Sequence, residues 1–216
     1  MAPETAGRAM DTVACAIDEL RAGRPVVVVD DEDRENEGDL AMAAQFATAQ
    51  MMGFFIRHTS GLICAPVSGE IADRLRLPLM VEPAEDADPA ATTAYTVSVD
   101  AVGTGSGISA ADRATTARAL ADASTLADQL IRPGHLFPLR ARPGGVAERR
   151  GHTEATVDLL RLAGLAPVGV ISEICEDDGS LAGSEKLRGF AGEHGLALIS
   201  VEAIAERLRD PAAAAV

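Results

Sequence analysis

The sequence predicts an α+β fold, in which a single domain over residues 1–216 holds a mixed, twisted β-sheet packed with helices in layers. The length of 216 residues suits one domain with a sizeable core. Short apolar runs typical of buried strands lie between segments whose apolar residues recur every three or four positions, as in amphipathic helices. The two kinds of segment do not alternate strictly, which favours a mixed sheet over a parallel one. The tail, about residues 210–216, is expected to be frayed.

Helices are predicted where an apolar stripe follows a capping residue. In the first, the apolar residues share one face and Gly23 follows the last turn. Ser68 and Ser109 are the N-cap residues of two others. In chain order, the predicted helices cover residues 12–22, 48–58, 68–75, 109–121, 153–162, 184–194 and 201–209.

Strands are predicted at apolar runs and at alternating patterns. Residues 26–29 are four consecutive valines, which is typical of a strand that is buried on both faces. In the sequence RPGH, Pro133 and Gly134 are turn formers, so a turn is expected there. Residues 82–93 are rich in Pro, Asp and Ala and predict a mobile loop. In chain order, the predicted strands cover residues 25–29, 40–44, 61–67, 95–101, 137–141, 168–175 and 196–201.

Composition narrows the class of protein. There are 19 basic and 33 acidic residues, and the net charge of −14 argues against nucleic acid as a partner. No apolar run approaches the roughly 20 residues of a membrane span, and the first ten residues contain no apolar signal region. The three cysteines lie far apart without metal-ligand spacing and predict two or three buried thiols in a reducing cytoplasm. Lys186 is the only lysine, which leaves little room for lysine-based covalent chemistry.

The sequence DDEDRENEGD at residues 30–39 is the densest chemical signal. Seven of its ten side chains are carboxylates, and it follows a predicted buried strand. Crowded carboxylates repel one another unless a cation binds, so a divalent ion with oxygen ligands is expected here. The alternative is a solvated acidic loop. An EF-hand loop is excluded because Asn36 and Met42 occupy the two diagnostic positions for Gly and Glu.

A second signal is the basic sequence at residues 149–154, where a helix is about to begin. Arg149, Arg150 and the Thr153 hydroxyl, together with the free amides of a helix N-terminus, predict an anion site suited to a phosphate monoester. His152 is placed to bind a metal or move a proton. The alternative is that Thr153 is only the N-cap and His152 only a surface residue.

Isolated residues add weaker signals. His135 lies in the RPGH sequence and could face a cleft, whereas His58 and His194 end predicted helices and are expected to interact with the helix dipoles. Glu173 lies on an apolar strand, where a carboxylate is either paired, functional or on a solvated face. Arg113 and its neighbouring threonines could bind an anion or be ordinary helix-surface groups.

Together these motifs resemble the 3,4-dihydroxy-2-butanone 4-phosphate synthase family of riboflavin biosynthesis. The matching stretches are DDEDRENEGD (30–39), RHTSGLICAP (57–66), YTVSVDA (95–101), GISAADRATT (107–116), RPGHLFPLRA (132–141) and RGHTEATVDLLRLAG (150–164). They occur in the family's order across nearly the whole chain. Many relatives continue into a GTP cyclohydrolase II domain with a cysteine zinc site, whereas this chain has no such cluster, so a stand-alone form is expected.

The resemblance implies a role for each matching residue. It makes Glu35 and His152 the metal ligands, and Arg34 and Asp39 substrate contacts. The substrate-binding set that it implies is Arg34, Glu35, Asp39, Arg149, Arg150, Gly151, His152, Thr153 and Glu173. Arg150 is a less secure contact than Arg149, because some members have glycine at this position. His135 and Glu173 are expected to be catalytic, and Glu37 and Asp33 are further candidates, beside Glu173, for the general base.

The resemblance also implies the reaction. D-ribulose 5-phosphate would be converted to L-3,4-dihydroxy-2-butanone 4-phosphate and formate through a metal-stabilised enediolate, loss of water, a skeletal rearrangement and loss of formate. Mg²⁺ or Mn²⁺, two ions per active site, would polarise the carbonyl. The family is homodimeric with shared active sites, so His135 or the loop around Asp100 is expected to act across the interface.

Two other functions remain open from the residues alone. A metal-dependent sugar-phosphate isomerase or aldolase would use the same metal and phosphate sites but release no formate. A non-catalytic Ca²⁺- or phosphate-binding module would bind these ligands without turnover.

Overall fold

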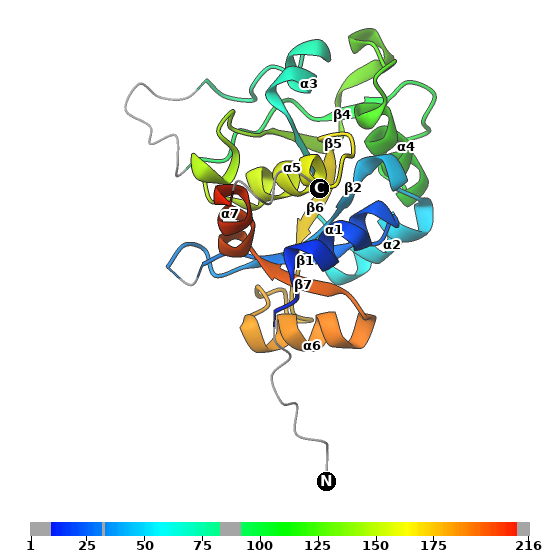
Figure 1. The fold of residues 1–216 in the computed structure, drawn as a ribbon. Helices are drawn as coiled ribbons and strands as arrows, with labels where there is room; N and C mark the ends of the chain where they lie inside the picture. Colours follow the sequence, from blue (N-terminus) through cyan, green and yellow to red (C-terminus); the bar gives the residue numbers. More distant parts are fainter. Residues whose placement is uncertain (1–9, 32, 83–91, 211–216) are drawn as a thin grey trace.

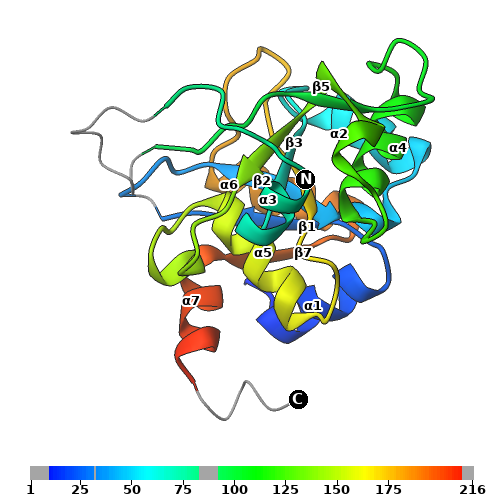
Figure 2. The same cartoon turned by 90° about the horizontal axis from the view of Figure 1, so that it is seen from above.

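The computed structural model describes residues 10–31, 33–82 and 92–210. Within this part of the chain, seven strands form one sheet in the order β4-β5-β3-β6-β2-β1-β7 (Figures 1 and 2). Its pairings are mixed, because β1 pairs antiparallel with β2 but parallel with β7, and β3 pairs parallel with β5 but antiparallel with β6. The strands are β1 Val26–Val29, β2 Gly38–Ala43, β3 Cys64–Val67, β4 Val99–Ala101, β5 Leu130–Arg140, β6 Gly169–Glu173 and β7 Ala197–Ser200. The predicted α+β fold with a mixed sheet is therefore confirmed.

Helices cover both faces of this sheet. They are α1 Val13–Arg21, α2 Ala49–His58, α3 Gly69–Arg74, α4 Ala110–Ala121, α5 His152–Leu162, α6 Ser184–His194 and α7 Val201–Arg209, with short 3₁₀ turns at Ala44–Phe46, Ala127–Gln129 and Gly145–Ala147. Most of these helices begin at the expected caps; the side chains of Thr12 and Ser109, for example, accept hydrogen bonds from amides in the first turn.

Two apolar clusters fill the space between the layers, one on each face. Strand alternation divides the valines of β1: Val27 packs with residues of α2, α4 and α6, whereas Val26 and Val28 pack with residues of α1, α5 and α7. The same division holds along β2: Leu40 and Met42 pack in the cluster with Val27, and Ala41 and Ala43 pack in the cluster with Val26 and Val28. The layered arrangement follows from this two-residue period. Among the described residues, no helix is long and apolar enough to cross a membrane.

The region around β4 and β5 differs from the prediction. The sequence RPGH is not a turn but part of β5, which has 11 residues instead of the five predicted over 137–141. The amides of Gly134 and His135 donate to the side chains of Ser98 and Asp100. These side-chain acceptors take the place of ladder partners, which is why a stretch with two turn formers can stay extended.

The predicted strand over residues 95–101 is also shorter than expected. Only Val99–Ala101 is a strand, and its register with β5 shifts between Val99 and Asp100. Tyr95 and Thr96 make isolated bridges, to Leu139 and Leu79. The alternating pattern predicts one continuous strand, but its first residues bridge to two different partners, Leu139 and Leu79, and form no ladder.

Three smaller expectations were corrected. Gly151, and not Thr153, is the N-cap of α5. Of the three thiols only Cys64 is buried, since Cys15 and Cys175 lie at half-buried positions. His58 and His194 do end α2 and α6, as predicted, but their rings also stack on each other and on Phe54 and Phe190. The expected loop over 82–93 and the frayed tail fall largely outside the described residues.

Candidate active site

A polar pocket opens where the acidic loop, the start of α5 and the end of β6 meet. Its lining comes from segments far apart in the sequence and includes six charged residues. The lining residues are Arg34, Glu35, Glu37, Asp39, Cys64, Thr93, Tyr95, Leu139, Arg149, His152, Thr153, Ile171 and Glu173. The sheet order explains the meeting, because β2 lies between β1 and β6 and carries the acidic residues beside Glu173.

Asp30 organises the acidic loop. It lies directly after β1, and its carboxylate accepts hydrogen bonds from the Arg34 guanidinium at 2.6 Å and from the Glu37 amide at 2.8 Å. The Glu35 amide also points to it, at 3.3 Å. Asn36 adopts a positive φ of 54°, which turns the chain back toward β2. The loop is therefore folded around one buried carboxylate, and Glu35, Glu37 and Asp39 line the pocket.

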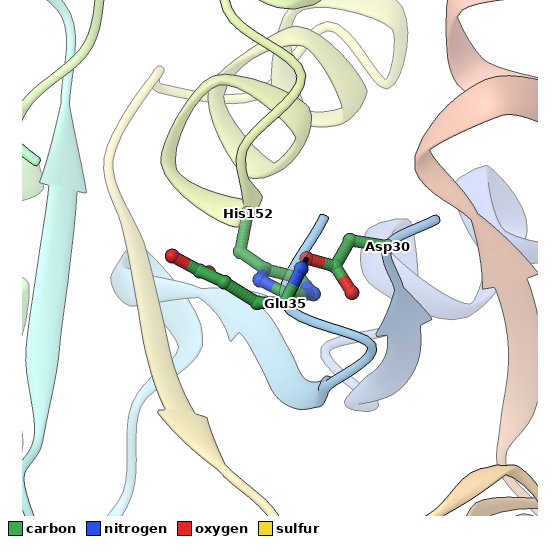
Figure 3. Close-up of side chains that lie close together, drawn as sticks. All are labelled: Asp30, Glu35 and His152. Carbon is green, nitrogen blue, oxygen red and sulfur yellow. Dashed lines mark hydrogen bonds between the residues drawn. The ribbon is translucent and has the colours of Figure 1, made fainter. Parts of the chain in front are cut away.

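Asp30, Glu35 and His152 place ligand atoms within 4.8 Å of one another (Figure 3). Both oxygens of Asp30 already accept hydrogen bonds from the loop. By contrast, the buried Nε2 of His152 has no hydrogen-bond partner among the described residues. Burial lowers the pKa of His152, which keeps the imidazole in the neutral form that binds metals. One oxygen of Glu35 pairs with the Arg34 guanidinium at 2.7 Å. Its other oxygen and Nε2 of His152 are therefore the ligand atoms that best fit a divalent cation, with Asp30 holding the loop behind them.

The remaining carboxylates crowd together on β2 and β6. Asp39 lies opposite Glu173 in the ladder, and its buried Oδ1 has no hydrogen-bond partner among the described residues. Burial, and then the negative charges of Glu173 and Glu37, raise the pKa of Asp39 well above its ordinary range. Burial, with the charge of Glu35 as the next cause, also raises the pKa of Glu37. Such carboxyl groups can hold or release protons nearer to neutral pH.

The two arginines at the start of α5 have different surroundings. Arg149 is buried, pairs with Glu154 at 2.8 Å, and also donates to the Thr93 hydroxyl at 2.9 Å. A Cβ at position 151 would lie 2.0 Å from an Arg149 nitrogen, so only glycine lets this guanidinium cross the helix start. Arg150 is exposed and pairs with Asp31 at 3.8 Å and with Glu202 of α7.

Two of the predicted catalytic residues lie apart from this pocket. Asp33 is exposed in the turn of the acidic loop and does not line the pocket. His135 lies on β5 four residues before Leu139, a distance of about 13 Å along an extended strand. Its Nδ1 lies 2.7 Å from the Asp100 carboxylate, and the His135 side chain is 42% exposed. Within one chain, therefore, the pocket lacks this histidine.

Five pocket residues were not predicted as site residues from the sequence: Cys64, Thr93, Tyr95, Leu139 and Ile171. Cys64 sits in an apolar strand and Tyr95 in an alternating one, so each looks like a core residue. The Cys64 sulfur lies 4.0 Å from the Tyr95 hydroxyl, and burial raises the pKa of Cys64 to about 12. Burial also raises the pKa of Tyr95. Both groups are therefore neutral near pH 7. Two signals were available: Tyr95 is the only tyrosine, and Cys64 and Tyr95 lie within the stretches RHTSGLICAP and YTVSVDA that resemble the family.

Curated relatives and solved structures match this chain closely. It is 59% identical over 194 residues to the "Riboflavin biosynthesis protein RibBA" of Nocardia farcinica, a match over 88% of this chain and 46% of that protein. It is 54% identical over 200 residues to the protein of the same name from Mycobacterium tuberculosis, over 91% of this chain and 46% of the relative. The chain thus spans about half the length of these relatives. The expected stand-alone form stays a prediction.

Among solved structures, one titled "Crystal Structure of 3,4-dihydroxy-2-butanone 4-phosphate synthase in complex with two Magnesium ions" superposes with a TM-score of 0.89 at 44% identity. That match covers 94% of this chain and 99% of the other. A synthase structure from Candida albicans gives a TM-score of 0.86 at 42% identity, over 94% and 100% of the two chains. The sequence profile of the 3,4-dihydroxy-2-butanone 4-phosphate synthase family matches residues 14–207. The chain therefore belongs to the 3,4-dihydroxy-2-butanone 4-phosphate synthase family.

Proposed function

We propose that this chain is a lyase that converts D-ribulose 5-phosphate to L-3,4-dihydroxy-2-butanone 4-phosphate and formate in riboflavin biosynthesis. The observation that carries the proposal is the pocket itself. In a chain of this family, it gathers metal-type ligands, titratable carboxylates and a helix N-terminus from three segments far apart in the sequence, namely residues 30–39, the start of α5 and the end of β6. An isomerase or aldolase would also need the metal ligands and the helix N-terminus. The crowded carboxylates suit the proposed reaction better, because it requires several proton transfers in sequence.

Glu35 and His152 are the proposed metal ligands, and Mg²⁺ or Mn²⁺ is the proposed ion, with two per active site. Support comes from the unpartnered Nε2 of His152, from the nearby carboxylate and from a relative whose title names two magnesium ions. When bound, such ions polarise a carbonyl and stabilise the negative charge that develops on it.

The substrate phosphate is proposed to bind at the first turn of α5. The amides around Gly151 and Thr153 have no partner within the helix, and the positive end of the helix dipole lies there. Arg149 lines the pocket beside them and brings a cation. Arg150 would have to leave Asp31 and Glu202 to reach the phosphate, so its contact is the weaker part of the proposal. Arg34 and Asp39 are proposed to contact the sugar end.

The proton transfers are proposed to use Glu37, Glu173 and His135. Glu37 lines the pocket and has a raised pKa, which makes it a better candidate for the first general base than the exposed Asp33. Glu173 lines the pocket beside the acidic loop, opposite Asp39 in the ladder between β2 and β6. In the overall reaction the five carbons of the substrate become four carbons in the product and one in formate, and the water lost in the dehydration is regained when formate leaves.

We also propose that the active unit is a homodimer with shared sites. His135 is exposed, and four exposed apolar residues lie on or beside β4 and β5: Val102 (58% exposed), Ile108 (50%), Leu126 (63%) and Ile131 (48%). An exposed apolar surface beside a candidate catalytic histidine fits a second copy of the chain, which would bring that histidine to the pocket opposite. The cytoplasm is the proposed compartment, in keeping with three free thiols.

The test is to incubate the purified chain with ribulose 5-phosphate and Mg²⁺ and to measure formate. We expect formate release that EDTA stops and that added Mg²⁺ restores. Consumption of substrate without formate would support an isomerase or aldolase, and binding of substrate without turnover would support a binding module. Either outcome would overturn the proposed reaction.

A further inference from the structure

We propose that Ser60 is a positioning residue that holds the Glu173 carboxylate in its reactive orientation. Ser60 lies in the turn between α2 and β3, outside the pocket, and the sequence motifs did not single it out. This inference rests on the proposed role of Glu173 in the reaction. It extends that proposal to the group that fixes the geometry of the carboxylate.

Two hydrogen bonds join Ser60 to Glu173. The Ser60 hydroxyl donates to Oε2 of Glu173 at 2.8 Å, and the Ser60 amide donates to the Glu173 carbonyl at 2.7 Å. Ser60 therefore holds both the side chain and the backbone of Glu173. Since Oε2 is engaged by Ser60, only Oε1 remains without a partner among the described residues, and the pair selects which oxygen can take part in the reaction.

The direction of the Ser60 proton follows from its other contacts. The Leu62 amide donates to the Ser60 oxygen at 3.3 Å, so an acceptor site of that oxygen is used within the turn. The Ser172 hydroxyl lies 3.2 Å away, but it donates to the Leu62 carbonyl at 3.0 Å. With its own proton given to Leu62, Ser172 could only accept from Ser60, so the Ser60 proton has two possible acceptors. The Glu173 carboxylate is favoured, because its oxygen lies closer, at 2.8 Å against 3.2 Å, and a carboxylate is a stronger acceptor than a hydroxyl.

The turn that carries Ser60 is itself held in place. Thr59 bridges to Ile174, next to Glu173, and its hydroxyl donates to the Phe55 carbonyl at 2.7 Å. Gly61 has a φ of 78°, and its carbonyl accepts from the buried Arg113 at 3.4 Å. Contacts to α2, α4 and β6 leave the turn little freedom to move. The hydroxyl is therefore preorganised, as a group that acts through orientation must be.

The experiment compares Ser60→Thr with Ser60→Val, which have nearly the same shape and differ in the hydroxyl. Ser60 is exposed, so either side chain has room. We expect the valine variant to lose about tenfold in kcat, the scale of one hydrogen bond to a charged group. The KM for ribulose 5-phosphate and the binding of Mn²⁺, measured by titration calorimetry, should stay within about twofold, because Ser60 contacts neither. The threonine variant should keep most of the wild-type kcat.

Two further variants separate a positioning role from a structural one. Ser172→Ala removes a neighbouring hydroxyl that does not contact the carboxylate, and it should leave kcat within about twofold. In a Glu173→Gln background, Ser60→Val should cause little additional loss, since its effect passes through the Glu173 carboxylate. Equal kcat values for the threonine and valine variants, or a full additional loss in the glutamine background, would overturn the inference. A wild-type chain that releases no formate would instead overturn the proposed function.

Discussion

At the residue scale, the site gains its reactivity from charges that destabilise the fold. Asp39 and Glu173 are directly opposite each other in neighbouring strands, a position in which like charges repel. Asp39 is also buried, and its Oδ1 accepts no hydrogen bond from the described residues, although Nδ1 of His152 lies 3.8 Å away. A carboxylate in such a position lowers stability, and the proposed contact of Asp39 with the substrate would account for its presence.

We therefore expect Asp39→Asn to stabilise the metal-free protein at pH 7.5 while it lowers formate release. The raised pKa means that the folded state binds more protons than the unfolded state between pH 3.8 and the folded-state value. The stability of the wild type accordingly falls as pH rises through this window, whereas an amide does not titrate. We expect a gain of at least about 1 kcal/mol, or about 2–4 °C in Tm, from thermal melts in EDTA.

The matched control for this measurement is Asp112→Asn. Hydrogen bonds from Gly105 lower the pKa of Asp112, so its contribution is present above its ordinary pKa and is lost as pH falls. The two variants should shift Tm in opposite directions at pH 7.5, and both differences should shrink toward pH 3. A Tm difference for Asp39→Asn that does not grow with pH would contradict the assignment.

A second prediction at this scale concerns the metal. Glu35→Ala or His152→Ala should abolish metal-dependent formate release and weaken Mn²⁺ binding at least tenfold, since each removes a proposed ligand. Circular dichroism should show the same helix content as the wild type. Asp30→Asn should behave differently, because Asp30 holds the loop and is not a proposed ligand. This variant should make the loop easier to cleave by a protease, while its affinity for Mn²⁺ falls less than in the two ligand variants. Activity retained in both ligand variants would exclude this metal site.

At the element scale, the close approach of β4 and β5 decides where His135 lies. A Cβ at Gly134 would lie 2.1 Å from the carbonyl carbon of Val99 and 2.3 Å from the amide nitrogen of Asp100. Both are backbone atoms, so neither can move aside as a flexible side chain could. The strand pair that orients His135 through Asp100 thus depends on a glycine at this position.

Gly134→Ala should therefore destabilise the protein by about 3 kcal/mol, as overpacking against backbone does. Gly53→Ala is the control, because Gly53 lies within α2 with nothing within 4 Å of an added Cβ. It should stabilise the protein by about 0.5–1 kcal/mol. Urea denaturation of both variants measures the difference, and a neutral Gly134→Ala would show that β4 and β5 can separate without cost.

At the scale of the whole molecule, the pocket of one chain lacks one of the proposed catalytic residues. It holds the proposed metal ligands, the phosphate site and Glu173, but His135 lies outside it. The exposed apolar residues beside β4 and β5 offer a surface through which a second chain could supply that histidine. Two copies that each carry a charge of −14 repel each other over most of their surfaces. An uncharged apolar patch is therefore where contact between them would cost least.

If the sites are shared, inactive variants should complement each other. Glu35→Ala and His135→Ala should each be inactive, but after subunit exchange an equal mixture should recover about a quarter of the wild-type activity, since half of the dimers would hold one intact site. A mixture of Glu35→Ala with His152→Ala should recover none, because both ligands come from the same chain. Light scattering should give twice the 22.3 kDa of the chain. No recovery in the first mixture would show that His135 acts within its own chain.

Much of the fold could be predicted because its signals are local. The period of apolar residues and the capping side chains placed the helices, and the valines of β1 indicated a strand that is covered on both faces. The errors at β4 and β5 have a different cause. Pro133 and Gly134 break strands in most contexts, and their extended state depends on acceptors at Ser98 and Asp100, 36 and 35 residues away along the chain.

For the site, the sequence by itself determined the chemistry on offer. A dense carboxylate run, a histidine and two arginines at a helix start are visible as residue types, and no folding can add to them. The tertiary structure alone decided which of them meet. It turned Asp30 into the centre of the loop, buried Asp39 opposite Glu173, brought Cys64 and Tyr95 to the pocket and joined Ser60 to Glu173. These are contacts between segments far apart along the chain, and only the pairing of distant strands specifies them.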